Sequence, residues 1–162
     1  MFRNFVSSEI GLIHLIFSIL ALIFGSYILF TQKGTKRHRQ VGYLYVVFML
    51  GVNITALMIY RLTGKFGVFH FLAIWGLLSV LIGIGVAVLR RPVKNWLIFH
   101  YYFMYWSVIG LYAAFAAEMS VRVPQTPFWA MVGVSSGLVS VLGTFVYFKI
   151  KGRWDKLAEV YQ

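Results

Sequence analysis

Five long apolar runs dominate this chain and limit what it can fold into. They cover residues 10–30, 41–60, 69–89, 96–117 and 128–150. A helix needs roughly 20 apolar residues to cross the hydrocarbon core of a bilayer, and each run is about that long. The sequence therefore predicts an all-α integral membrane bundle of five transmembrane helices. The bundle forms a single domain over residues 1–162, and its first four helices make a four-helix core.

The composition supports a membrane protein over a soluble one. Apolar residues make up 60 % of the chain and charged residues only 12 %, whereas a soluble domain carries about 25 % charged residues. No Asp, Glu, Lys or Arg lies in the middle of any apolar run. Because ion-coupled carriers generally keep such a charge for function, this absence weakens the case for a proton- or sodium-coupled transporter.

The basic residues predict how the chain is oriented in a bacterial cytoplasmic membrane. Cytoplasmic loops carry an excess of Lys and Arg. We therefore expect the N-terminus to lie outside and the C-terminus to lie in the cytoplasm. A net charge of +11 gathered in loops indicates contact with membrane lipids and argues against nucleic acid. Eleven basic residues fall on the predicted inner side and four on the outer: Lys33, Lys36, Arg37, Arg39, Arg90, Arg91, Lys94, Lys149, Lys151, Arg153 and Lys156, against Arg3, Arg61, Lys65 and Arg122.

Several chemistries find no support in the sequence. The chain has no cysteine, which excludes disulfides, thiolate metal sites, iron–sulfur clusters and covalently attached haem. It also contains no Gly-rich phosphate loop, no His-Glu-x-x-His and no Gly-x-Ser-x-Gly. A soluble hydrolase or a nucleotide-binding enzyme is therefore not expected, and no catalytic residue is predicted.

Four histidines are the candidate cofactor ligands. His14, His70, His38 and His100 each lie near the N-terminal end of one of the first four predicted helices. Because successive helices run antiparallel, His14 and His70 fall near the outer face, and His38 and His100 near the cytoplasmic face. The two depths are separated by roughly 20–30 Å of helix, which excludes one tetrahedral zinc site. Two facing pairs of imidazoles would instead suit the axial positions of two haem irons.

Small residues near two of these histidines have two interpretations. They could make room for a flat macrocycle, or they could let neighbouring helices approach closely. The residues concerned are Ser18, Ala21 and Gly25 after His14, and Ser107, Gly110, Ala114 and Ala117 after His100.

Two further groups are candidates for helix contacts. Asn53 and Thr55 are polar residues within the second run, suited to hydrogen bonding with another helix or to a place near a cofactor. Gly133 and Gly137 mark a close-packing face on the fifth run, used either within the bundle or by a second copy of the chain.

The stretch from Lys33 to Tyr45 resembles a family signature. It reads Lys-Gly-Thr-Lys-Arg-His-Arg-Gln-Val-Gly-Tyr-Leu-Tyr, and is similar to a "G-T-x-x-H-R-x-x-G-x-x-Y" pattern in bacterial predicted membrane proteins known as domain of unknown function 2306. His70, Arg90-Arg91, His100 with Met104, and Arg122-Val123-Pro124 fit the same pattern. The resemblance covers roughly residues 10–125 and implies no activity.

A more distant similarity supplies a functional hypothesis. The alternation of His14 with His70 and of His38 with His100 resembles the transmembrane cytochrome b561 group, in which a four-helix core holds two haems b. The resemblance implies a membrane oxidoreductase that transfers electrons across or within the bilayer, of the quinone or ferric reductase type, with a quinone or small redox substrate as partner. The alternatives are a cofactor-free scaffold or assembly factor, and a small-solute permease.

Overall fold

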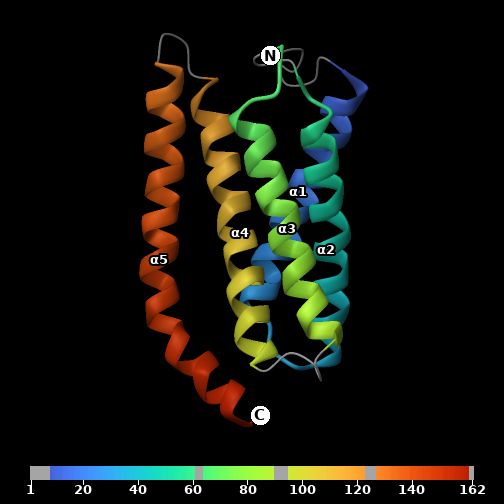
Figure 1. Cartoon of the computed structure of the whole chain (residues 1–162), viewed down its shortest axis with the longest axis vertical. Helices are drawn as coiled ribbons and strands as arrows, with labels where there is room; N and C mark the ends of the chain where they lie inside the picture. Colours follow the sequence, from blue (N-terminus) through green and yellow to red (C-terminus); the bar gives the residue numbers. More distant parts are fainter. Residues whose placement is uncertain (1–7, 61–63, 90–94, 123–126, 161–162) are drawn as a thin grey trace. The chain divides into compact units, whose positions relative to one another are not determined.

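The computed structural model describes residues 8–60, 64–89, 95–122 and 127–160. Within these ranges it contains five α-helices and no β-strand (Figure 1). The helices are α1 (Glu9–Phe30), α2 (Lys36–Leu57), α3 (Val68–Leu89), α4 (Trp96–Ser120) and α5 (Phe128–Val160). The predicted all-α class is confirmed. Of the basic residues used to predict orientation, Arg3, Arg61, Arg90, Arg91 and Lys94 lie outside the described residues, as do Val123 and Pro124 of the family pattern.

The chain divides into two compact units, Met1–Leu81 and Ile82–Gln162. The first contains α1, α2 and most of α3. The second contains the last residues of α3, then α4 and α5. A single domain over residues 1–162 stays a prediction.

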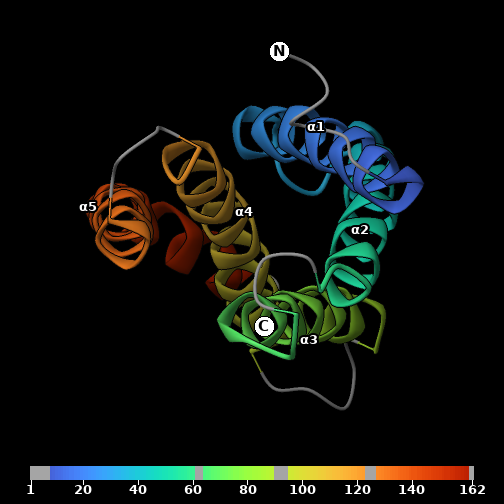
Figure 2. The ribbon, with the colours of Figure 1, turned by 90° about the horizontal axis from the view of Figure 1, so that it is seen from above.

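In the first unit, α1 packs along α2, and the two helices lie side by side in both views (Figures 1 and 2). The face of α1 that carries Ser18, Ala21 and Gly25 is buried. Phe17 of α1 lies over Gly51 of α2, where an added Cβ would come within 2.5 Å of its ring. Glycine at position 51 therefore lets α1 and α2 approach closely. The choice between a packing face and a cofactor groove for the α1 stripe stays a prediction.

Helix α2 begins at Lys36, five residues before the predicted residue 41. The prediction counted apolar residues only and missed the start signal. Thr35 is the N-cap, and its hydroxyl oxygen accepts from the backbone N–H of His38 at 3.1 Å. A threonine at this position satisfies one of the backbone donors that a helix leaves unpaired at its start. The cap places Lys36, Arg37 and His38 inside the first turn of α2.

In the second unit, α4 packs along α5. The Tyr105 hydroxyl donates to the Gly143 carbonyl oxygen of α5 at 2.7 Å, and Tyr105 is 3 % exposed. A Cβ on Gly143 would lie 2.7 Å from Ile109, so glycine sets how closely the helices approach there. Further along, Ser120 and Ser135 hydroxyls lie 3.0 Å apart. The helix contact therefore combines close backbone approach with satisfied polar groups, as packing in a bilayer requires.

Helix α5 extends ten residues beyond the predicted end at residue 150. The tail carries good helix formers, and Lys151 and Asp155 form an i,i+4 ion pair at 2.8 Å. Trp154 packs its ring against Tyr101 at 5.3 Å and Tyr105 at 5.4 Å between centroids. Contact with α4 thus holds a charged, helix-forming segment in helical form after the apolar run ends.

Four of the five helices are long and apolar enough to cross a membrane, counted over the described residues. They are α1, α2, α3 and α5, and α4 is not among them. Its 25 residues are sufficient in length, but its first half combines His100 with tyrosine and tryptophan, whose polar atoms lower the mean hydropathy. A span by α4, the fifth in the predicted bundle, stays a prediction.

Lys33 closes the C-terminal end of α1. Its ammonium group donates to the carbonyl oxygens of Ile28 at 2.5 Å and Leu29 at 3.0 Å. These carbonyls belong to the last turn of the helix, where the backbone offers acceptors without a partner and a cation is favoured. Burial lowers the pKa of Lys33 from 10.5 to about 8.

Lys33 is expected to make unfolding depend on pH in the alkaline range. Below pH 8 the amine stays charged in the folded state, and burying this charge lowers the free energy of unfolding. Between about pH 8 and 10.5 the folded state binds fewer protons than the unfolded state, so stability should rise with pH. Thermal unfolding in detergent should show this rise, and Lys33→Gln should abolish it. The same rise in Lys33→Gln as in the parent would contradict the assignment, and Lys36→Gln is the matched control.

Candidate functional site

His14 on α1 is fixed by a hydrogen-bond chain that crosses to α2. Its Nδ1 lies 2.9 Å from the Thr55 hydroxyl oxygen. That hydroxyl lies 2.6 Å from the Gly51 carbonyl oxygen, which can only accept. Thr55 therefore donates its single proton to the backbone and accepts from His14 Nδ1–H. This tautomer leaves the lone pair on Nε2, the arrangement typical of metal-binding histidines, whose other ring N–H is held by a fixed acceptor.

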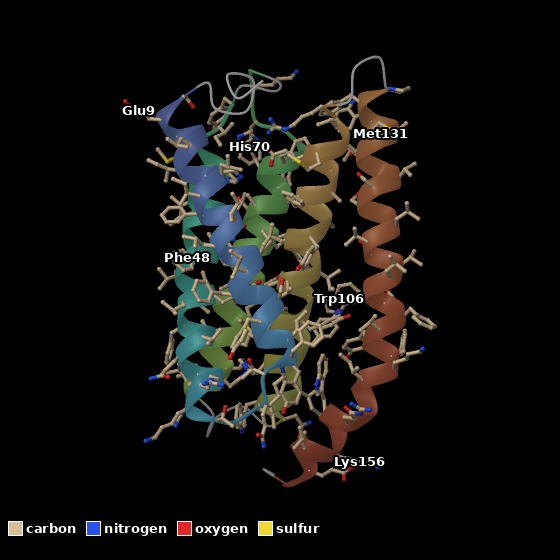
Figure 3. The ribbon with its side chains drawn as sticks, turned by 180° about the vertical axis from the view of Figure 1, so that it is seen from behind. Glu9, Phe48, His70, Trp106, Met131 and Lys156 are labelled. Carbon is tan, nitrogen blue, oxygen red and sulfur yellow. The ribbon has the colours of Figure 1, made fainter. Side chains whose placement is uncertain are left out.

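His70 lies in the first turn of α3 and is 4 % exposed. Figure 3 shows it near the end of the first unit at which Glu9 begins α1. Its ring lies between two aromatic rings, with centroids 4.6 Å from Tyr60 and 4.7 Å from Phe66. The backbone N–H of Gly67 donates to His70 Nδ1 at 3.1 Å. Packing and this hydrogen bond together fix both the position and the tautomer of the ring.

The tautomer of His70 is opposite to that of His14. Because Nδ1 accepts a hydrogen bond, the neutral ring carries its proton on Nε2. Nε2 is buried and has no hydrogen-bond partner among the described residues. In this conformation His70 offers a buried N–H donor, whereas iron ligation requires an Nε2 lone pair. The described ring therefore does not fit axial ligation until Nδ1 releases the Gly67 N–H.

His38 lies at the opposite end of the first unit from His14 and His70. It occupies the first turn of α2, while His14 and His70 lie near the starts of α1 and α3 (Figure 1). Its side chain is partly buried. The alternation of depth predicted for these three histidines agrees with the helix directions within this unit.

His100 lies in the second unit, near the start of α4. Its Nδ1 is 2.7 Å from the Gly83 carbonyl oxygen. Since a carbonyl only accepts, His100 donates Nδ1–H and carries the lone pair on Nε2. This is the same tautomer as in His14. Gly83 also lets α4 approach, because a Cβ there would lie 2.7 Å from the Met104 sulfur.

The four predicted ligands therefore fall into three states. His14 and His100 have the tautomer that suits a metal and His70 has the opposite one, while the tautomer of His38 stays open. Pairing of His38 with His100 joins residues of the two units and stays a prediction. Among the described residues, no group of three or more His, Cys, Asp or Glu could hold a metal ion.

The small-residue stripe of α4 is divided between two faces. Ser107 and Ala117 are buried, while Gly110 and Ala114 are exposed, and a Cβ on Gly110 would meet nothing within 4 Å. The stripe is thus a packing face only in part. An aromatic cluster lies close to it: in Figure 3, Trp106 projects from α4, and its ring centroid is 6.1 Å from that of Tyr147 on α5.

Sequence reasoning missed the partners that fix the histidines. Thr55 was a candidate for a helix contact or a cofactor neighbour, and it makes the contact by accepting from His14. Gly67 and Gly83 act through backbone atoms, which no side-chain pattern reveals. Asn53 donates to the Met49 carbonyl oxygen at 2.7 Å, and a Cβ on Gly76 of α3 would lie 2.6 Å from its Oδ1. Thr55 therefore makes the predicted hydrogen bond to another helix, whereas Asn53 bonds within α2 and packs close to Gly76 of α3.

Comparison with known proteins identifies a family. The model of the family described as "Predicted membrane protein (DUF2306)" matches residues 11–150. None of the curated proteins and none of the solved structures compared with the chain matches it. The match extends the resemblance seen in residues 10–125 over the fifth helix as well. With its apolar helices and this match over most of its length, the chain belongs to the DUF2306 family of predicted membrane proteins.

Proposed function

We propose that this protein is a b-type cytochrome of the bacterial cytoplasmic membrane that transfers electrons across or within the bilayer. His14 and His70 would hold an outer haem, and His38 and His100 an inner one. One observation carries the proposal: each predicted pair contains a histidine whose Nδ1–H is already held by an acceptor. His14 donates to Thr55 at 2.9 Å and His100 to the Gly83 carbonyl oxygen at 2.7 Å.

The chain's own residues would hold and orient the cofactor, whose bound iron supplies the redox change. The Thr55 hydroxyl and the Gly83 carbonyl set the tautomer and orientation of the two imidazoles. Outer partners of this kind usually contribute 10–100-fold to metal affinity or activity, by order of magnitude. A membrane quinone or another small redox molecule is the proposed substrate class, because His14, His38 and His70 lie on helices long and apolar enough to cross the bilayer.

His70→Ala is expected to lower the haem content from two per chain to one. For His70 to ligate, the turn at Gly67 must release Nδ1, so that Nε2 can present its lone pair. The measurement is haem per chain by absorption and pyridine haemochrome assay. Phe66→Leu is the control, since it loosens the aromatic clamp without removing the imidazole. Retention of both haems in His70→Ala would show that His70 is a hydrogen-bond donor beside the cofactor, and loss of both would also contradict the pairing.

We propose that all five helices span the bilayer, with the N-terminus outside and the C-terminus in the cytoplasm. Support for α4 comes from Tyr105, whose hydroxyl finds an acceptor on α5 and so tolerates a lipid environment. The chain has no cysteine, so introduced thiols report topology without background. A membrane-impermeant maleimide added to spheroplasts should label Lys65→Cys and spare Lys36→Cys until the membrane is opened. The reverse pattern would invert the proposed topology.

A scaffold or assembly factor is the second candidate. The observation in its favour is the Gly133 and Gly137 face of α5, where a Cβ at either glycine would meet nothing within 4 Å. Exposed Val134, Leu138 and Val141 lie on the same stretch of helix. Such a face suits another helix, including one from a second copy of the chain. A protein that stays colourless after haem reconstitution, yet co-purifies as a dimer dependent on Gly137, would favour this candidate.

A further inference from the structure

An apolar groove runs between α1 and α2 in the first unit, at the end opposite His14 and His70. Its volume is about 820 Å³. Ile23 and Phe24 line it from α1, and Leu44 and Val47 from α2, with Arg37 and Gln40 at one end. Ile23 is 56 % exposed and Val47 59 % exposed, so the groove is open along its side. The groove combines a long apolar wall with one polar end, and this arrangement suits a ligand that has an apolar chain and a polar headgroup.

The length of the groove matches one leaflet of a bilayer. Arg37 and Val47 are ten residues apart on α2, which corresponds to about 15 Å along a helix. The hydrocarbon core of a bilayer is about 30 Å thick, so each leaflet contributes about 15 Å. An acyl chain lying beside α2 from Arg37 inward would reach the level of Val47 near the bilayer midplane.

Within the first unit, the polar end of the groove carries positive charge and no carboxylate lies beside it. The first turn of α2 contains Lys36 and Arg37 and no acidic residue. In the first unit the acidic residue is Glu9, which begins α1 at the other end of that helix. A guanidinium binds a phosphate through two parallel hydrogen bonds, and an amide such as Gln40 adds a donor. The charge therefore favours an anionic headgroup over a zwitterionic or neutral one.

We propose that this groove is a specific binding site for an anionic phospholipid. The headgroup phosphate binds Arg37 and Gln40, and one acyl chain lies along Ile23, Leu44 and Val47. Arg37 is distinguished from the other basic residues of the region because it lines the groove, whereas Arg39 is exposed and does not. The groove is lined by none of the four histidines proposed to bind haem.

The test is native mass spectrometry of the purified full chain in detergent, titrated with phosphatidylglycerol or phosphatidylcholine of the same acyl composition. The parent protein should bind one phosphatidylglycerol in preference to phosphatidylcholine. Arg37→Gln should weaken that binding about tenfold, the size of one charge-assisted contact. Arg39→Gln makes the same charge change outside the groove and should change binding less than about twofold.

A second pair of variants tests the apolar wall. Leu44→Trp should fill the groove and displace the lipid, whereas Leu72→Trp on α3, at a similarly exposed position, should leave binding intact. Equal losses for the two arginine variants would indicate a diffuse charge effect and overturn the proposal. Equal binding of the two lipids would do the same, and so would displacement of phosphatidylglycerol by an equimolar neutral quinone.

Discussion

Replacing His14 with alanine is expected to remove one haem from each chain and to leave the other spectroscopically intact. His14 is the histidine of the first unit whose Nδ1–H is held by a side chain, Thr55, that is itself anchored to the Gly51 carbonyl. Removing the imidazole removes the Nε2 lone pair that would bind iron, and no neighbouring cysteine exists to replace it. The measurement is haem per chain together with the reduced-minus-oxidised absorption spectrum.

Thr55→Val separates ligation from orientation. It keeps the His14 imidazole and removes the acceptor that fixes its tautomer, so haem affinity should fall roughly 10–100-fold without loss of the band. Ile13→Ala changes an exposed neighbour on the same helix, 45 % exposed, and should behave as the parent. Full haem content in His14→Ala would exclude His14 as a ligand, and loss of both haems would contradict the pairing, as for His70→Ala.

Gly51→Ala is expected to lower the stability of the first unit markedly, although it adds only one methyl group. The new Cβ would lie 2.5–2.8 Å from three atoms of the Phe17 ring. The Phe17 ring in turn packs on Phe48 at 6.2 Å, and Phe48 stacks on Phe24 at 5.3 Å. Overpacking of this kind costs about 1–3 kcal/mol. Because Thr55 bonds the Gly51 carbonyl, a shift of α1 from α2 should also weaken the His14 contact.

The control for Gly51→Ala is the same substitution where space is open. A Cβ at Gly110 or Gly133 meets nothing within 4 Å, and alanine favours a helix over glycine by about 1 kcal/mol. Thermal unfolding in detergent should therefore show Gly51→Ala below the parent, with Gly110→Ala and Gly133→Ala at or above it. An unchanged midpoint for Gly51→Ala would mean that α1 and α2 do not approach at this glycine.

Length and hydropathy were sufficient to predict the helices but not their ends. The predicted span 10–30 agrees with α1 within one residue, because Ser8 caps it and the apolar run coincides with the helix. Helix α2 begins earlier and α5 ends later than predicted. The charged start of α2 is helical because a threonine caps it, and the charged end of α5 is helical because Trp154 packs on α4. Hydropathy detects neither effect. The first half of α4 is rich in aromatic rings with polar atoms, so hydropathy alone does not decide whether this helix spans the bilayer.

The candidate site was predictable only to the level of residue type and depth. Four histidines near successive helix starts suggested axial ligands, and within the first unit their alternation agrees with the helix directions. The tautomers could not be predicted from the sequence, because they depend on backbone groups at Gly67 and Gly83 and on the register between α1 and α2. His14 and His70 have equal standing in the sequence, yet one presents a lone pair and the other an N–H.

The absorption spectrum of the detergent-purified protein, oxidised and then reduced with dithionite, tests the central claim most directly. With haem quantified per chain, the account predicts sharp reduced bands of a b-type haem at two haems per chain. One haem per chain would retain a redox role and remove one pair. A protein that stays colourless after expression with a haem precursor and after reconstitution with haem would contradict the cytochrome proposal.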